Sequence, residues 1–196
     1  MKLHNHIAAI IRNSQKEESC FYFGTQFGVF FIGLFLLNAM DGWFDADLSP
    51  LGLKQSVELG ERRRNGGYVA VFCADQQRAY KSATIAFADT NIPIIVDSRL
   101  RECNYGDYNA GEKKFVDGQR TERINTPYPN GESYMQTKDR MFAFLEYLKQ
   151  NYDGKKVLIV GARATQFGIQ NYIEGTSYEE LVVAKFTWQP GWEYEI

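Results

Sequence analysis

Four short apolar runs, separated by segments long enough for helices, constrain the fold of this chain most strongly. They lie at Ile7–Ile11, Tyr68–Cys73, Ile92–Val96 and Val157–Val160. Apolar runs of this length are typical of buried strands. Because strands that alternate with helices favour a parallel sheet, we predict an α/β fold, a three-layer α/β/α sandwich with a mostly parallel sheet. The 196 residues contain no linker, repeat or low-complexity tract, so we expect a single domain over residues 1–196.

The segment after Ser49 carries the clearest helix signals. Ser49 is a good N-cap, and Pro50 fits the first helical position. We expect Leu53, Val57 and the region of Gly60 to face inward. Further helices are expected at about Asp75–Ala88, Glu132–Gln150 and Ala164–Ile173. In the helix Glu132–Gln150, the apolar stripe consists of Met135, Met141, Phe142, Leu145 and Leu148.

The charge of the chain disfavours nucleic acid as a partner, and the spacing of its cysteines disfavours a metal site. The net charge is −2, and the basic residues are scattered apart from Arg62–Arg64, which we interpret as a solvated helix end. The chain therefore lacks the basic patch of a nucleic-acid-binding protein. Cys20, Cys73 and Cys103 are an odd number at no metal-ligand spacing. Cys103 adjoins Glu102 and is either an exposed thiol or, as is more common for a free cysteine, a packed side chain. Free thiols favour a reducing, cytoplasmic location, and we expect no metal and no cofactor.

The segment Cys20–Met40 is unusual because it carries no charge across 21 residues, about the length that spans a bilayer. Its continuous apolar part, Val29–Leu37, is only nine residues long, and polar side chains at Thr25, Gln26 and Asn38 interrupt the rest. No basic region and cleavage site mark it as a secretory signal. We therefore disfavour a membrane role and expect a buried element or one covered by a partner.

Charged residues follow the predicted strands at the edge where a parallel sheet gathers its carboxyl ends. Arg12 follows the first run, Arg78 opens the helix after the second, and Glu102 follows the third. The turn Gly161–Arg163 follows the fourth, although Ala162 has no functional group. Two guanidinium groups at one edge match the oxygens of a phosphate, and a carboxylic acid beside them could protonate a leaving oxygen. The pattern predicts a phosphate site.

Five sequence blocks resemble those of the histidine phosphatase superfamily, the phosphoglycerate-mutase-like phosphatases. The resemblance runs from about Asp41 to Ile196, with a weaker echo at Ile7–Ser19. In chain order, the blocks are DADLSPLG, CADQQRAYKSA, LRECNYGDYNAG, PYPNGESY and VLIVGARAT. The resemblance implies the phosphoglycerate-mutase-like version of the α/β/α sandwich.

The resemblance also implies a phosphohistidine mechanism. In that family, one histidine attacks phosphorus, two arginines and a second histidine hold the phosphoryl group, and a carboxyl group protonates the leaving alcohol. By position, Arg12 and Arg78 would clamp the phosphate and Glu102 would be the acid. Ser19 stands where the family often has an asparagine that touches phosphate.

Both histidines of that mechanism are missing from their positions. Asn13 occupies the position of the nucleophile, and its amide nitrogen has no lone pair available for attack. Ala162 occupies the position of the second histidine. The chain's histidines, His4 and His6, lie at the other end of the first predicted strand, about 25 Å from Asn13 in an extended chain.

The leading hypothesis is a histidine-phosphatase-like protein with impaired catalysis, which keeps a site for a phosphorylated small molecule. One alternative is an active phosphatase with a different nucleophile. Another is an interaction module that uses residues 20–40, and assembly into a homo-oligomer stays open. A dinucleotide-binding domain is disfavoured because Gly161–Arg163 is not a G-x-G-x-x-G motif. We expect Arg101–Asn130, which is polar and without sustained periodicity, to be functional or mobile and to set specificity.

Overall fold

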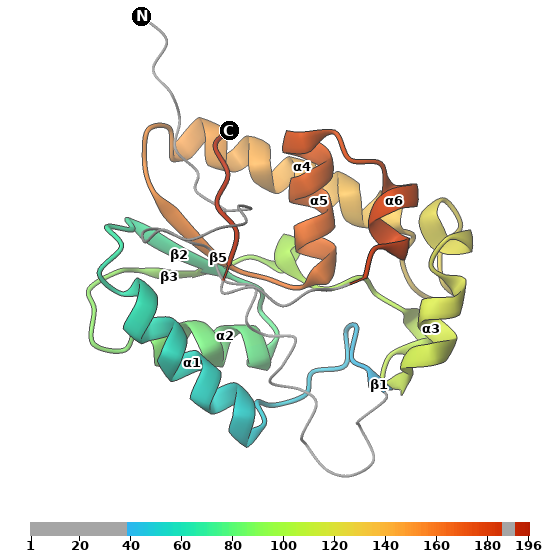
Figure 1. Ribbon diagram of the computed structural model, residues 1–196, viewed down its shortest axis with the longest axis horizontal. Helices are drawn as coiled ribbons and strands as arrows, with labels where there is room; N and C mark the ends of the chain where they lie inside the picture. Colours follow the sequence, from blue (N-terminus) through green and yellow to red (C-terminus); the bar gives the residue numbers. More distant parts are fainter. Residues whose placement is uncertain (1–38, 186–190) are drawn as a thin grey trace, which may run out of the picture.

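The computed structural model describes residues 39–185 and 191–196. The predicted strand Ile7–Ile11 and the site candidates Arg12, Asn13 and Ser19 lie outside the described residues, as does nearly all of the segment Cys20–Met40. The described part has three layers, with helices on both faces of a parallel sheet, as the sequence predicts (Figure 1).

The strands are β1 (Ala39–Met40), β2 (Ala70–Cys73), β3 (Ile94–Val96), β4 (Gly111–Glu112) and β5 (Val157–Val160). The helices are α1 (Pro50–Arg63), α2 (Gln77–Ala86), α3 (Lys113–Gln119), α4 (Tyr134–Asn151), α5 (Arg163–Glu174) and α6 (Tyr178–Val183). Short 3-10 helices lie at Ser98–Leu100, Gly106–Tyr108 and Glu122–Ile124. Figure 1 shows α1 and α2 on one face of the main sheet and α4 and α5 on the other. No helix in the described ranges is both long and apolar enough to cross a membrane.

The main sheet of the described chain has the strand order β3-β2-β5, and both pairings are parallel. Val71 in β2 is paired with Ile94 on one side and with Leu158 on the other. Pro93, which cannot donate a ladder hydrogen bond, comes directly before β3 at the edge of this sheet, as expected for proline. All of β2 and β5 is buried, so both faces of these strands contribute to the core.

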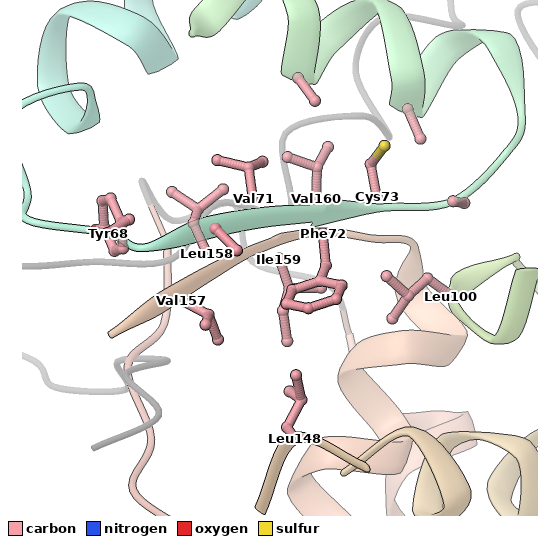
Figure 2. Close-up of a cluster of buried hydrophobic side chains, with 14 of the residues drawn as sticks. Tyr68, Val71, Phe72, Cys73, Leu100, Leu148, Val157, Leu158, Ile159 and Val160 are labelled. Atoms are coloured by element: carbon pink, nitrogen blue, oxygen red, sulfur yellow. The ribbon is translucent and has the colours of Figure 1, made fainter. Parts of the chain in front are cut away.

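Alternate residues of β2 and β5 fill the two sides of the core. In Figure 2, Val71 and Val160 point to one face of the sheet, whereas Phe72 and Ile159 point to the other, where Leu148 of α4 meets them. The Phe72 ring packs edge-on against Phe144 of α4, with ring centroids 5.4 Å apart.

The start of α1 confirms the predicted cap, because the Ser49 hydroxyl accepts a hydrogen bond from the Gly52 amide at 3.1 Å. The predicted inward face is wrong for Leu53 and Val57, which are 45% and 46% exposed, but it is confirmed for the region of Gly60. The residues of α1 that face inward are Gly52, Ser56, Leu59, Gly60 and Arg63. The buried Arg63, only 7% exposed, also corrects the interpretation of Arg62–Arg64 as wholly solvated.

Small residues explain the inward face of α1. A Cβ atom on Gly60 would lie 2.4 Å from the carbonyl oxygen of Ala86, the last residue of α2. The hydroxyl of Ser56 lies 3.2 Å from that of Ser82, which comes from α2. The two helices therefore approach closely through small side chains, whereas Leu53 and Val57 lie on the outer side.

Helix α4 confirms most of its predicted apolar stripe. Met141, Leu145 and Leu148 are buried, but Phe144 is buried where the periodicity favours Phe142. The Phe142 ring instead packs against Tyr172 of α5 at the edge of the core, with centroids 4.9 Å apart.

The segment Arg101–Asn130, expected to be functional or mobile and without sustained periodicity, contains regular elements. It contains α3, and its strand β4 pairs with β1 in an antiparallel sheet. Its buried residues join a second hydrophobic cluster: Cys103, Tyr105, Val116, Ile124 and Tyr128. Aromatic side chains give this segment a core that the period-based analysis does not detect.

Candidate functional site

Three sequence-predicted residues follow strands at the carboxyl edge of the main sheet. Arg78 is the second residue of α2, which follows β2. Glu102 follows β3 and a short 3-10 helix, and Ala162 lies between β5 and α5. The predicted partners Arg12, Asn13 and Ser19 lie outside the described residues. The structure therefore describes half of the predicted site residues, and the other half lies outside the described part of the chain.

Arg78 is held in place by the loop that precedes α1. Its Nη1 donates to the carbonyl oxygen of Phe44 and its Nη2 to that of Gly42, both at 2.8 Å. The side chain is buried, and burial lowers the pKa of the guanidinium while the charges of Asp41 and Glu102 counteract that effect. Each terminal nitrogen carries a second N–H, so the anchored fork can still donate to an anion.

Glu102 is fixed by backbone amides rather than by a cation. Its Oε1 accepts from the amides of Cys103 and Ala164 at 2.8 and 3.2 Å, and its Oε2 accepts from the Arg163 amide at 3.0 Å. Arg163 and Ala164 are the first two residues of α5, so the carboxylate sits at the positive end of that helix. The three bonds orient the carboxyl group toward the turn that contains Ala162.

The turn between β5 and α5 is shaped around Thr165. A Cβ on Gly161 would lie 2.7 Å from the Thr165 methyl carbon, which explains the glycine. The Thr165 hydroxyl accepts from the Ala162 amide at 3.1 Å and donates to the Leu100 carbonyl at 3.0 Å. Ala162 is buried in this turn and offers a methyl group beside Glu102. The strand, turn and helix that the sequence predicts are confirmed, and a side chain able to hold phosphate is absent at position 162.

The block PYPNGESY contributes Glu132, which acts through Arg140 to hold the backbone at Glu102. Glu132 pairs with Arg140 of α4, with Oε1 and Nε 3.0 Å apart. Arg140 in turn donates from Nη1 to the carbonyl of Arg101 and from Nη2 to that of Glu102, both at 2.8 Å. A charged pair thus clamps the backbone on which Glu102 sits, which is a positioning role that the sequence pattern alone does not reveal.

Asp41 is a site residue that the sequence analysis misses. One of its carboxylate oxygens is buried with no hydrogen-bond partner among the described residues. Burial and the nearby Glu102 raise its pKa, whereas the charge of Arg78 lowers it. The position of Asp41 beside Arg78 depends on how the loop before α1 folds onto α2. No local sequence motif predicts that contact.

Trp43 attaches the same loop to the backbone of Glu102. Its indole Nε1 donates to the carbonyl oxygen of Glu102 at 2.8 Å, and the Arg101 guanidinium lies 4.5 Å from its ring centroid. Arg101 is also paired with Asp75 through a Nε–Oδ1 hydrogen bond of 2.6 Å. The loop over residues 41–44 is therefore tied to both Arg78 and Glu102.

The described cysteines do not supply a nucleophile. Cys73 and Cys103 are both free and buried, which confirms the favoured interpretation of Cys103 as a packed thiol and excludes the exposed alternative. Burial raises the pKa of Cys73 to about 12 and raises that of Cys103 as well, because the thiolate is disfavoured away from water. Cys20 lies outside the described residues.

Comparisons with known proteins agree with the fold. Residues 36–186 match the family model of the histidine phosphatase superfamily (branch 1). The chain is 29% identical over 141 residues to an uncharacterized phosphatase of Bacillus subtilis, covering 71% of each protein. It is 28% identical over 161 residues to a phosphoglycerate mutase of Schizosaccharomyces pombe, covering 74% of this chain and 76% of that one. The solved structure of YhfR from Bacillus stearothermophilus has the same fold, with a TM-score of 0.68 at 23% identity over 78% of this chain and 79% of that one.

Proposed function

The chain belongs to the histidine phosphatase superfamily, and on that premise we propose that it binds a phosphorylated small molecule at the carboxyl edge of its sheet, with catalysis impaired. The observation that carries the proposal is the pair of fixed side chains Arg78 and Glu102, with Glu102 bonded to the helix start that directly follows Ala162. These two side chains are held in position, while Ala162 has no group that can hold a phosphoryl oxygen.

The chemistry assigned to each residue follows from its contacts. Arg78 would donate its remaining N–H groups to phosphate oxygens, with Arg12 as the second half of the clamp. Glu102, oriented by the α5 amides, would face the leaving oxygen. Asn13 would occupy the place of the attacking group without a lone pair to attack. Loss of a nucleophile from a catalytic unit costs several orders of magnitude in rate, whereas charge-assisted binding of phosphate survives.

The cellular location, the class of partner and the cofactor requirement are also part of the proposal. We place the protein in the cytoplasm, because its described cysteines are buried free thiols and a reducing compartment keeps them so. The net charge of −2 speaks against nucleic acid as a partner. The proposed reaction needs no cofactor, because positioning and charge stabilisation carry phosphoryl transfer.

The first prediction concerns binding without turnover. We expect isothermal titration of the full chain with inorganic phosphate to give saturable binding, and Arg78→Lys to weaken it about tenfold, because lysine cannot keep the anchored fork. Arg62→Lys on α1, away from the site, is the matched control and should change binding less than twofold. No measurable phosphate binding by the unmodified chain would contradict the proposal.

The catalytic part of the proposal is tested by restoring both histidines. We expect the chain to hydrolyse p-nitrophenyl phosphate at a rate close to the uncatalysed one, and Asn13→His with Ala162→His to raise the rate by at least about a hundredfold. Rapid turnover by the unmodified chain would instead support the alternative of an active phosphatase with another nucleophile.

A further inference from the structure

Asn109 joins two segments that lie far apart in the sequence. It directly follows the 3-10 helix Gly106–Tyr108 and is half-buried. Its Oδ1 accepts hydrogen bonds from two backbone amides, that of Trp43 at 2.9 Å and that of Tyr105 at 3.1 Å. Its Nδ2 donates to the Oδ1 of Asn104 at 2.7 Å. One side-chain oxygen therefore holds the loop before α1 against the segment that contains Tyr105.

Asn109 also packs directly against the backbone of that loop. Gly42, which precedes Trp43, has a φ of +51°, in the left-handed region that favours glycine. A Cβ atom there would overlap the Oδ1 of Asn109 and would lie 2.7 Å from Cδ2 of Tyr105. The loop approaches Asn109 this closely only because residue 42 has no side chain.

The backbone beside Asn109 is held in a conformation that alanine rarely adopts. Ala110 has a φ of +59°, and a left-handed residue other than glycine costs free energy unless its surroundings fix it. Directly after it, Gly111 of β4 pairs with Met40 of β1, the strand that leads into the loop. The turn is thus fixed on both sides, by the strand pair and by the hydrogen bonds of the Asn109 side chain.

The loop that Asn109 holds is also the loop that orients Arg78. The carbonyl oxygens of Gly42 and Phe44 accept hydrogen bonds from Nη2 and Nη1 of Arg78, both at 2.8 Å. Trp43 lies between these two residues in the chain, and its amide is the one that Asn109 binds. The buried guanidinium therefore depends on two carbonyl groups whose shared backbone is anchored by Asn109.

We propose that Asn109 is a positioning residue of the phosphate site, which fixes the loop over residues 41–44 and thereby sets the direction in which Arg78 presents its remaining N–H groups. A guanidinium group held in one orientation binds an oxyanion more tightly than a mobile one, because less conformational entropy is lost on binding. The inference rests on the proposed phosphate site and adds to it a residue that acts through Arg78.

The first test compares phosphate binding by two asparagine variants of the same segment. We expect Asn109→Ala to weaken the binding of inorganic phosphate to the full chain about fivefold in titration calorimetry, which corresponds to one ordinary hydrogen bond. The effect stays partial because the Trp43 indole gives the loop a second attachment, at the carbonyl of Glu102. Asn130→Gly is the matched control, since the Asn130 side chain donates to Asp107 instead and its φ of +57° suits glycine. It should change the affinity less than twofold.

A double-mutant cycle shows whether Asn109 acts through Arg78. In Arg78→Lys, the two bonds to the loop carbonyls cannot both be kept, so the position of the loop no longer directs the cation. We expect Asn109→Ala to weaken phosphate binding less than twofold in the Arg78→Lys background. The same fivefold loss in both backgrounds would refute the positioning role, because independent effects add.

A spectroscopic readout follows the orientation of Arg78 without any ligand. We expect nitrogen NMR relaxation of the Arg78 Nε–H group to give a lower order parameter in Asn109→Ala than in the unmodified chain, and no change in Asn130→Gly. Asn109→Asp keeps an oxygen acceptor for both amides and should keep Arg78 ordered. Asn109→Ser, whose shorter side chain cannot reach both amides, replaces the alanine variant if that variant does not fold.

The outcomes separate this inference from the proposal on which it rests. If phosphate binds equally well to Asn109→Ala and to the unmodified chain, the positioning role is refuted and the phosphate site stands. If phosphate binds to neither protein, the phosphate site fails, and the relaxation measurement decides whether Asn109 holds Arg78. An Arg78 side chain that stays equally ordered in Asn109→Ala refutes that role.

Discussion

At the scale of single residues, the site combines what the sequence places and what only the fold brings together. Arg78, Glu102 and Ala162 were predictable, because each follows a strand of a parallel sheet and falls in a family block. Asp41 was not, because its place beside Arg78 depends on a contact between segments far apart in the chain. A sequence pattern reports spacing along the chain, whereas a buried charge pair depends on tertiary packing.

Asp41 gives a pH prediction at this scale. Burial raises its pKa in the folded protein, so between the unfolded and folded pKa values the native state binds more protons than the unfolded state. Its contribution therefore destabilises the fold increasingly as the pH rises through that window. We expect Asp41→Asn to raise the melting temperature at pH 7.

The control is the same comparison below pH 3.8, the ordinary pKa of an aspartate. There the Asp41 side chain is mostly protonated in the folded and in the unfolded state, so its burial carries little penalty. The difference in melting temperature should shrink there. An Asp41→Asn protein that melts lower than the unmodified chain at pH 7 would show that the attraction between Asp41 and Arg78 outweighs burial.

At the scale of elements, the sequence located the helices better than their faces. The start of α1 followed from Ser49 and Pro50, and β5 followed from its apolar run. The inward face of α1 followed only at Gly60, because periodicity also assigns large apolar residues such as Leu53 to the core, whereas close helix packing places the small Ser56 there. The elements within residues 101–130 did not follow for a related reason, since the buried residues there include scattered aromatics without a period.

Gly60 makes the element-scale argument testable. Alanine there would place a Cβ atom 2.4 Å from the backbone oxygen of Ala86, so α1 must shift away from α2. We expect Gly60→Ala to lower the free energy of unfolding by about 1–3 kcal/mol in urea denaturation, despite the better helix propensity of alanine. Gly118→Ala in α3 is the control, because a Cβ there meets nothing within 4 Å, and it should be neutral or stabilising.

At the scale of the whole molecule, the proposed ligand site joins segments from most of the described chain. The loop before α1 contacts Arg78, while Glu102 ties the region after β3 to the start of α5. Arg140 links α4 to the backbone of Glu102. A ligand that bridges these segments should therefore stabilise the fold as a unit.

That coupling is measurable as a shift in melting temperature. A ligand at a hundred times its Kd stabilises the native state by about 2.7 kcal/mol if it does not bind the unfolded chain. We expect phosphate to raise the melting temperature in proportion to log concentration, and Arg78→Lys to need about ten times more phosphate for the same shift. Equal shifts in both proteins would mean that phosphate acts as a general salt and not at this site.

The carboxylate of Glu102 at the start of α5 has one more consequence. Many phosphate sites draw on the free amides of a helix, which are dipoles and feel ionic strength weakly, but here an internal counterion already occupies them. The affinity of the site must then come from full charges on side chains, and attraction between full charges is screened by dissolved ions. Physiological salt therefore becomes a determinant of occupancy, and the protein should respond to the ionic composition of its surroundings as well as to the concentration of its ligand.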